Sequence, residues 1–392
     1  MGKLKLIIPV SKLYLIIFVL TRSIYSQDFS LGGYTKFLLN YGELNNERKF
    51  NSFFHSRLNC KYYLSESINL NAGIRNRIVF GESPDIVFGY SGSEFIKDDL
   101  VKLDYKIWEK PRSINHIEVD RLYAVFQYNK FDLTIGRQRI AWGTSWVWNI
   151  IDLFNPLSIL EFDYEERQAV DAVRIQFYSS PLSKFDFALR PSNKRDNTTA
   201  LLQYYTNLME YDFFVLGGIH KSRFVFGGAF SGDIYDAGFR GELLYLENPL
   251  KIKSELMTDL INEKQNQISF VLSIDYTFKN SLYLHSEVLF NNIGRTKNIQ
   301  HYLYDALKIG LLSPSRWNLF YQIGFNFTPL TRGDFISLHN PVDGSFLIMP
   351  SLHISLFTNL DFSAILLFTQ GENFSEFGHK IKLLFTRLKY SF

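Results

Sequence analysis

The chain has 392 residues, of which 42 are Lys or Arg, 39 are Asp or Glu and only one is a cysteine. This length would suffice for two or three soluble domains, but no Pro- or Ser-rich linker and no shift in composition divides the sequence. The lone Cys60 excludes an internal disulfide framework.

Residues 1–26 have the pattern of a secretory signal peptide. Two lysines precede a mostly apolar run over residues 6–20, and the small Ser26 stands at the expected cleavage position. The run is shorter than the roughly 20 residues that a membrane-spanning helix needs. These 26 residues hold four of the basic side chains and no acid, which leaves 38 basic against 39 acidic residues over 27–392. The formal charge of +3 therefore belongs to the targeting segment, and we expect no nucleic-acid partner.

Residues 27–392 show two-residue alternation along their whole length. Within 268–278 and 317–328, apolar residues at every second position alternate with mostly polar ones. Strands of about ten residues with one apolar and one polar face are typical of transmembrane barrels. Aromatic residues make up 17% of the chain, and many stand at the predicted strand ends, as expected of interfacial girdles. We therefore predict one all-β domain, a transmembrane antiparallel β-barrel.

Turn signals set the number of strands. Tight connections are predicted at 64–67, 128–131, 179–184, 207–210, 232–235, 279–281, 329–334 and 358–360. Longer connections are predicted at about 42–49, 81–115, 143–167, 192–197, 247–266, 292–316 and 371–376, with two short ones near 220–223 and 341–345. Short periplasmic turns that alternate with longer external loops are the rule for outer-membrane barrels. The count is about 18 strands (16–18), with both termini in the periplasm.

One segment departs from the alternation. Residues 136–156 read G-R-Q-R-I-A-W-G-T-S-W-V-W-N-I-I-D-L-F-N-P, in which a strand predicted over 131–142 leads into a tryptophan-rich loop. Asn155 and Pro156 are a favourable N-cap and first position for a short helix. Because large apolar groups seldom stay in water, the loop is predicted to fold inward and narrow the lumen. The constriction residues are Trp142, Trp146, Trp148, Asp152, Asn155 and Pro156. The alternative, that they only stabilise an external loop, is equally open.

The pattern G-R-Q-x-x-x-W-G followed by D-x-x-N-P resembles outer-membrane porin-like proteins of the alginate-export and phosphate-selective porin kind. The resemblance is sharp over about 21 residues and generic over the rest of the chain. It implies a passive channel in the outer membrane of a Gram-negative cell, often for anionic or sugar-like solutes. It supplies no particular substrate.

The polar face of the strands predicts the charge of the lumen. Inward acids on this pattern include Asp186, Glu242, Asp275 and Glu287, but basic residues are in excess over the first seven strands. Rings of Arg and Lys favour anions, and Arg can bind a carboxylate or phosphate through two hydrogen bonds. We therefore predict a weakly anion-preferring channel. The channel-lining candidates are Arg57, Lys61, Arg75, Arg77, Arg121, Arg174, Arg190 and Arg240.

Enzyme signatures are weak. The eight histidines lack metal-ligand spacing, and no Gly-x-Ser-x-Gly or phosphate-binding glycine loop occurs in the sequence. We expect no enzymatic activity, no metal and no cofactor. The preferred function is passive diffusion of small solutes. The main alternative is a non-conducting barrel that binds or exports surface polysaccharide or serves a secretion complex.

The last strand predicts which side chains of the wall face lipid and which face the lumen. Residues 388, 390 and 392 are apolar or aromatic and are predicted to face lipid, whereas Arg387 and Lys389 face the lumen. An aromatic C-terminal residue resembles the terminal strand of outer-membrane barrels, which the assembly machinery reads. We expect Phe392 to serve as that signal, and the last strand to pair with a first strand that begins near Phe29.

Overall fold

A computed structural model describes residues 28–44, 47–82, 100–154, 168–248, 265–303, 306 and 309–392. The predicted signal peptide and the helix start at Asn155 and Pro156 lie outside the described residues. None of the helices among these ranges is long and apolar enough to cross a membrane.

The described chain is almost entirely strand. The first strands are β1 (Phe29–Leu44), β2 (Glu47–Ser65), β3 (Ile68–Gly81), β4 (Asp104–Lys110), β5 (Ser113–Tyr128), β6 (Phe131–Gln138), β7 (Val170–Ser180), β8 (Ser183–Arg190), β9 (Thr199–Leu208) and β10 (Tyr211–His220). They are followed by β11 (Arg223–Ile234), β12 (Ala237–Leu246), β13 (Gln267–Thr277), β14 (Leu282–Asn291), β15 (Trp317–Thr328), β16 (Thr331–His339), β17 (Phe346–Phe357), β18 (Leu360–Gln370) and β19 (Ile381–Ser391). Two short 3-10 helices are η2 (Arg195–Asn197) and η4 (Ile299–Tyr302).

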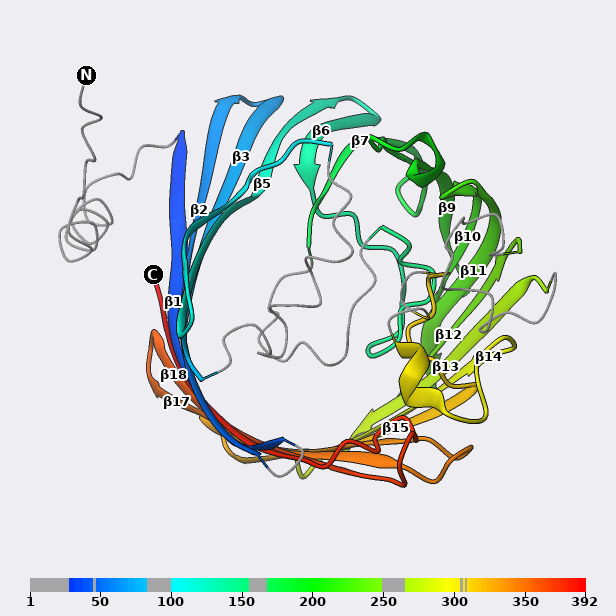
Figure 1. Cartoon of the computed structure of the whole chain (residues 1–392). Coiled ribbons are helices and arrows are strands. Elements are labelled where there is room, and N and C mark those ends of the chain that lie inside the picture. The colour runs from blue at the N-terminus through cyan, green and yellow to red at the C-terminus, as the bar shows by residue number, and fades with distance from the viewer. Residues whose placement is uncertain are drawn as a thin grey trace, which may run out of the picture.

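The strands form one antiparallel sheet that closes on itself through β1 and β19 (Figure 1). β5 explains how 19 strands make an 18-strand wall. β3 pairs along one edge of β5, while β4 and β6 pair with the two halves of its other edge, at residues 113–118 and 122–128. β4 thus extends the line of β6 and adds no further position to the ring. The predicted all-β barrel of about 18 strands is confirmed.

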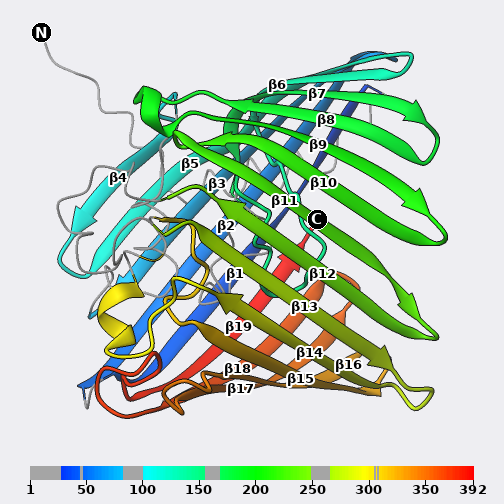
Figure 2. The same cartoon turned by 90° about the vertical axis from the view of Figure 1, so that its right-hand side faces the viewer.

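The strands are inclined to the barrel axis, and short turns gather at one end of the barrel (Figure 2). All eight predicted tight connections overlap these turns. The predicted longer connection at 42–49 is wrong, because β1 and β2 stay paired as far as Leu44 and Glu47. Strands can continue past an apolar band into solvent, so polar residues there do not mark their ends.

The outer face of the barrel is apolar. Side chains that point away from the lumen remain exposed over more than 40% of their area on strands around the ring, among them Ile74, Ile135, Val215, Leu243, Leu272 and Ile323. A continuous apolar surface of this kind would be unstable in water and matches the hydrocarbon of a bilayer. The outer face is therefore the lipid-facing band of a membrane-spanning barrel.

The inner face is only partly polar, which corrects the prediction of a polar lumen face. Inward side chains on the turn side are mostly polar or charged, but farther from the turns they include Leu244, Val271, Leu289, Phe320 and Leu367, which are buried. These side chains belong to the largest apolar cluster among the described residues. Apolar groups can face inward here because a segment of the chain inside the barrel covers them.

The predicted phase of the last strand is confirmed. Leu388 and Tyr390 are exposed on the outer face, and inward Lys389 stacks over the ring of Tyr34 at 5.3 Å. Phe392 exchanges two backbone hydrogen bonds with Gly33, of 2.9 and 3.0 Å, beyond the last paired residue of β19. The pairing of β1 with β19 that closes the barrel thus extends to Phe392.

The β1–β19 register predicts a specific cross-link. Asn40 lies opposite Phe385, seven residues from the hydrogen-bonded Gly33–Phe392 pair, so it is a non-hydrogen-bonded pair with close Cβ atoms. In a Cys60→Ser background, Asn40→Cys with Phe385→Cys should form a disulfide on mild oxidation, detected by gel mobility without reductant. The control, Asn40→Cys with Leu383→Cys, should stay reduced, and preferential cross-linking of this shifted pair would contradict the register.

Candidate functional site: the lumen and its inner segment

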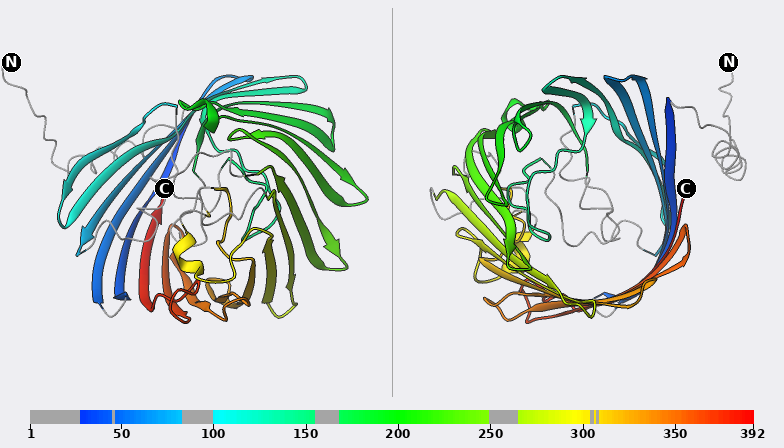
Figure 3. Two further views of the ribbon diagram at one scale, coloured as in Figure 1. Left: turned by 45° about the vertical axis from the view of Figure 1, so that its right-hand side comes forward. Right: turned by 180° about the vertical axis from the view of Figure 1, so that it is seen from behind.

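The chain leaves the wall after β6 and enters the barrel. We call residues 139–154 the inner segment, and Figures 1 and 3 show it within the ring of strands. The strand predicted to reach residue 142 ends at Gln138. The Gln138 side chain donates to the carbonyl oxygens of Thr134 and Ala172, at 3.1 and 3.0 Å. Gly143 has a φ of 125°, which favours glycine at this bend.

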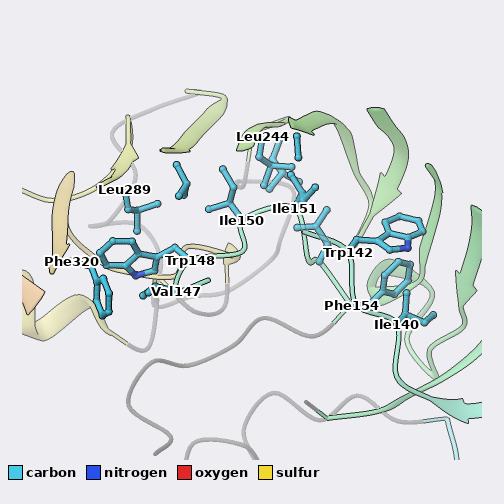
Figure 4. Close-up of a cluster of buried hydrophobic side chains, with 14 of the residues drawn as sticks. Ile140, Trp142, Val147, Trp148, Ile150, Ile151, Phe154, Leu244, Leu289 and Phe320 are labelled. Carbon is cyan, nitrogen blue, oxygen red and sulfur yellow. The ribbon is translucent and has the colours of Figure 1, made fainter. Parts of the chain in front are cut away.

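Apolar side chains attach the inner segment to the wall (Figure 4). Trp148 is 3% exposed and packs edge-to-face with Phe320 of β15, at 6.4 Å between ring centroids. Trp142 is equally buried, packs against Phe154 at 5.3 Å and donates its indole N–H to Asp186 at 3.3 Å. The structure thus brings these two predicted constriction residues into a core against the wall.

Two carboxylates from the wall hold the backbone of the segment. Glu242 of β12 accepts backbone N–H bonds from Thr144 at 2.6 Å and Ser145 at 2.9 Å on one oxygen. Its other oxygen accepts a bond from Ile151 at 3.2 Å. One carboxylate therefore binds both ends of the stretch from Thr144 to Ile151.

Glu287 of β14 binds the backbone of residues that lie between Ser145 and Ile151. It accepts backbone N–H bonds from Trp148 at 2.6 Å and from Trp146 and Val147 at 3.3 Å each. His285 lies beside it, with 3.4 Å between its Nε2 and the carboxylate. Successive backbone N–H groups form a concave binding site for an anion, and here the anion is a wall side chain.

The predicted basic residues lie on the inner face, but most are paired with acids. Arg57 is buried and lies 2.6 Å from Asp120, and Arg75 lies 2.8 Å from Glu118. The other close contacts to acids are Arg77 with Glu118 at 3.8 Å, Arg121 with Asp120 at 3.6 Å, Arg174 with Asp186 at 2.5 Å, and Arg240 with Asp275. Lys61 lies over the Tyr63 ring at 4.4 Å, and Arg190 is buried.

A β-bulge explains why Glu118 and Asp120 escaped prediction. Arg121 pairs with Gly73 and Val119 with Ile74, so Asp120 is the extra residue. Simple alternation back along the chain from an inward Arg121 would place Asp120 and Glu118 on the outer face. The bulge reverses the alternation, so both acids face the lumen. These two inward acids offset part of the predicted excess of positive charge over the first strands.

Arg137 is a further buried basic group. It binds Asp171 through two hydrogen bonds of 2.8 and 3.0 Å and also donates to the Val101 carbonyl at 2.5 Å. The Val101 N–H donates in turn to Asp171 at 2.9 Å. This pair ties the chain before β4 to the wall at β6 and β7.

A third carboxylate joins loops at the end opposite the turns. Glu376, between β18 and β19, accepts hydrogen bonds from Ser313 at 2.8 Å, Asn318 at 2.7 Å and Asn340 at 2.8 Å. Burial of the carboxylate, with a smaller contribution from nearby Asp343, raises the pKa of Glu376 to about 7. Within the described ranges, no group of three or more His, Cys, Asp or Glu side chains is arranged to hold a metal ion.

Of the predicted constriction residues, Trp146 is 60% exposed and Asp152 is 1% exposed. Asn155 and Pro156 lie outside the described residues. The structure thus brings Trp142, Trp146, Trp148 and Asp152 together in one segment inside the barrel. Sequence reasoning named Glu242 and Glu287 only as inward acids, since nothing in their local sequence marks them as anchors.

Comparisons with known proteins identify the fold. No protein-family model and no curated protein sequence matches the chain. Solved structures do match. Acinetobacter baumannii OccAB4 and Pseudomonas aeruginosa OccK5 (OpdH) each have a TM-score of 0.56 and 8% identity. The alignments cover 93% and 94% of this chain and 98% of each of theirs. Salmonella typhi OmpF in complex with daunomycin has a TM-score of 0.50 and 9% identity, with 93% and 97% coverage. These neighbours are outer-membrane porins, and the fold of this chain is the porin-like β-barrel.

The Glu287 anchor predicts a local loosening. Glu287→Ala removes the acceptor of three backbone N–H groups, two of them buried, and each hydrogen bond to a charged group contributes about 1.5–3 kcal/mol. We expect chymotrypsin to cut within residues 139–154 of this variant at a protease concentration that leaves the parent intact, while the barrel stays folded. Glu372→Ala, an exposed acid outside the segment, is the control. Equal resistance of Glu287→Ala and the parent would contradict the anchor.

Glu376 predicts a pH dependence. Because the folded pKa is raised from 4.5 to about 7, the docked loop binds a proton more tightly than the open one. Its docking is most stable below about pH 4.5 and weakens as the pH rises through 7. Proteolysis of the β18–β19 loop should therefore accelerate between pH 5 and pH 9, after correction for protease activity. The variant Glu376→Gln should show a flat profile, and an unchanged slope in this variant would assign the effect to another group.

Proposed function

We propose that the chain is a passive diffusion channel of the outer membrane for small solutes of an anionic or sugar-like kind. The observation that carries the proposal is a closed barrel with an apolar outer face and polar, charged side chains on the turn side of its lumen. Similar solved structures are porins that mediate passive diffusion of small solutes. At 8% to 9% identity they support the architecture and no particular substrate.

We expect weak ion selectivity. The eight basic side chains predicted to attract anions remain the candidates, but six of them lie within 4.0 Å of a carboxylate. These six arginines share four carboxylates, so most of their charge is cancelled and a small positive potential is left at the distance of a passing ion. A modest preference for anions and ready passage of uncharged polar solutes fit this arrangement best.

The partners that we propose are the lipid of the outer membrane and the barrel-assembly machinery. The apolar outer face supports the first. The aromatic Phe392, at the end of the closing strand, supports the second. Secretion through a signal peptide over residues 1–26 stays a prediction from the sequence.

A second candidate is a non-conducting barrel that binds or exports surface polysaccharide or serves a secretion complex. The inner segment is the observation that favours it. Residues 139–154 build an apolar core inside the barrel against the wall, as a lumen partly filled by loops would require.

Conductance in planar lipid bilayers tests the proposed function. The full-length protein should give stable ion conductance in KCl, with a reversal potential in a KCl gradient that shows weak anion selectivity. Deletion of residues 145–154 should raise the conductance, because it removes a packed segment from the lumen. Glu372→Ala is again the control and should conduct like the parent.

The absence of conductance in the parent would contradict the channel. Conductance only after the deletion would favour the second candidate, a barrel closed by its inner segment. Strong cation selectivity would contradict the expected weak preference for anions.

A further inference from the structure

The three tryptophans of the inner segment have different environments. Trp142 and Trp148 are each 3% exposed, whereas Trp146, between them in the sequence, is 60% exposed. Large apolar side chains normally pack when a core lies within reach, and the neighbours of Trp146 on both sides do so. An exposed indole between two buried neighbours therefore points to a ligand rather than to folding.

The backbone under this indole is fixed. The N–H groups of Ser145, Trp146 and Val147 all bind wall carboxylates, at 2.9, 3.3 and 3.3 Å. The guanidinium of Arg240, an inward residue of β12, lies 5.2 Å from the ring centroid. The indole thus lies inside the barrel with one cationic neighbour, and its large exposed area leaves room for a second group to stack. A rigid aromatic ring binds at low entropic cost, because little motion is lost.

Polar groups continue from Trp146 along the wall. Arg240 is ion-paired with Asp275 of β13, and Tyr283 of β14 lies next to this pair, with Arg332 of β16 at 5.5 Å from its ring. Arg332 in turn binds Asp334 at 2.7 Å. The row crosses from β12 to β16, four strand spacings or about 19 Å. This length suits a chain of rings better than a single small ion.

The charges of the row cancel. Two guanidinium groups face two carboxylates, so an anionic solute meets Asp275 and Asp334 and a cationic one meets Arg240 and Arg332. A hydroxyl group can donate to a carboxylate and accept from a guanidinium, which carries five N–H donors. A solute with many hydroxyl groups and no net charge is therefore matched to both partners at once.

We propose that Trp146, Tyr283 and the pairs Arg240–Asp275 and Arg332–Asp334 form a subsite for a neutral oligosaccharide. The apolar C–H face of a pyranose ring stacks on the Trp146 indole, and the ring hydroxyls exchange hydrogen bonds with the two ion pairs. The inference deepens the proposed function and rests on it only in requiring that solutes reach the lumen.

Calorimetric titration of the purified full-length protein in detergent micelles tests the subsite without requiring conduction. The neutral probes are maltohexaose and cellohexaose, and the anionic probe is a hexameric uronate. We expect a neutral probe to bind to the parent protein. Trp146→Ala should lower the affinity for this probe about tenfold, which is the scale of one lost aromatic stacking contact. Trp146→Phe should retain most of the affinity. Tyr128→Ala, an exposed aromatic residue of β5 on the outer face, is the matched control and should bind like the parent.

A second variant tests the balance of charge. Asp275→Asn leaves Arg240 without its carboxylate partner. It should shift the preference from the neutral probes toward the uronate.

Each of three results would overturn the proposal: no binding of either neutral probe, equal affinity in Trp146→Ala and the parent, or tighter binding of the uronate than of the neutral probes by the parent. Binding without conductance would contradict the channel and leave the subsite standing. Conductance without binding would contradict only the subsite.

Discussion

Two buried carboxylates determine how the inside of this barrel is organised. An irregular segment inside the barrel has backbone N–H groups that cannot bond to the backbone of a neighbouring strand. Leaving such groups buried and without a hydrogen bond costs free energy. Glu242 and Glu287 accept six of these N–H groups from residues 144–151. The carboxylates are themselves buried, so each side of the contact compensates for the lost hydration of the other. The inner segment is therefore held in its conformation by the wall.

This contact divides the lumen into two kinds of surface. Where the inner segment docks, the inward residues of the wall are apolar and form a core with Trp142 and Trp148. Toward the turns, Arg, Asp, Tyr and Gln side chains pair with one another within and between strands. Asp334, for example, binds Arg332 on its own strand and Gln322 on the next. A solute passing through would meet compensated charges and an exposed indole rather than a ring of one sign. This is why we connect the lumen with weak ion selectivity and with uncharged, hydroxyl-rich solutes.

Local patterns in the sequence were enough for the wall. Alternation and turn residues predicted the barrel, its tight turns and the phase of β19, because strand phase and short turns depend on neighbouring residues. They failed at Asp120, where a single extra residue reverses the phase of β5. They could not pair Glu287 with Trp148, which stands 139 residues away. Three tryptophans within seven residues predicted an inward fold, but which of them stays exposed depends on the docked conformation.

Hydrogen exchange at the six anchored amides, those of Thr144, Ser145, Trp146, Val147, Trp148 and Ile151, measures the central contact most directly. Peptide-resolved exchange of the full-length protein should show protection of residues 144–151 comparable to that of the wall strands. The protection should be lost in the double variant Glu242→Ala, Glu287→Ala while the strands stay protected. Exchange of these amides at the rate of an open loop in the parent protein would contradict the account, because the inner segment would then not be held by the wall.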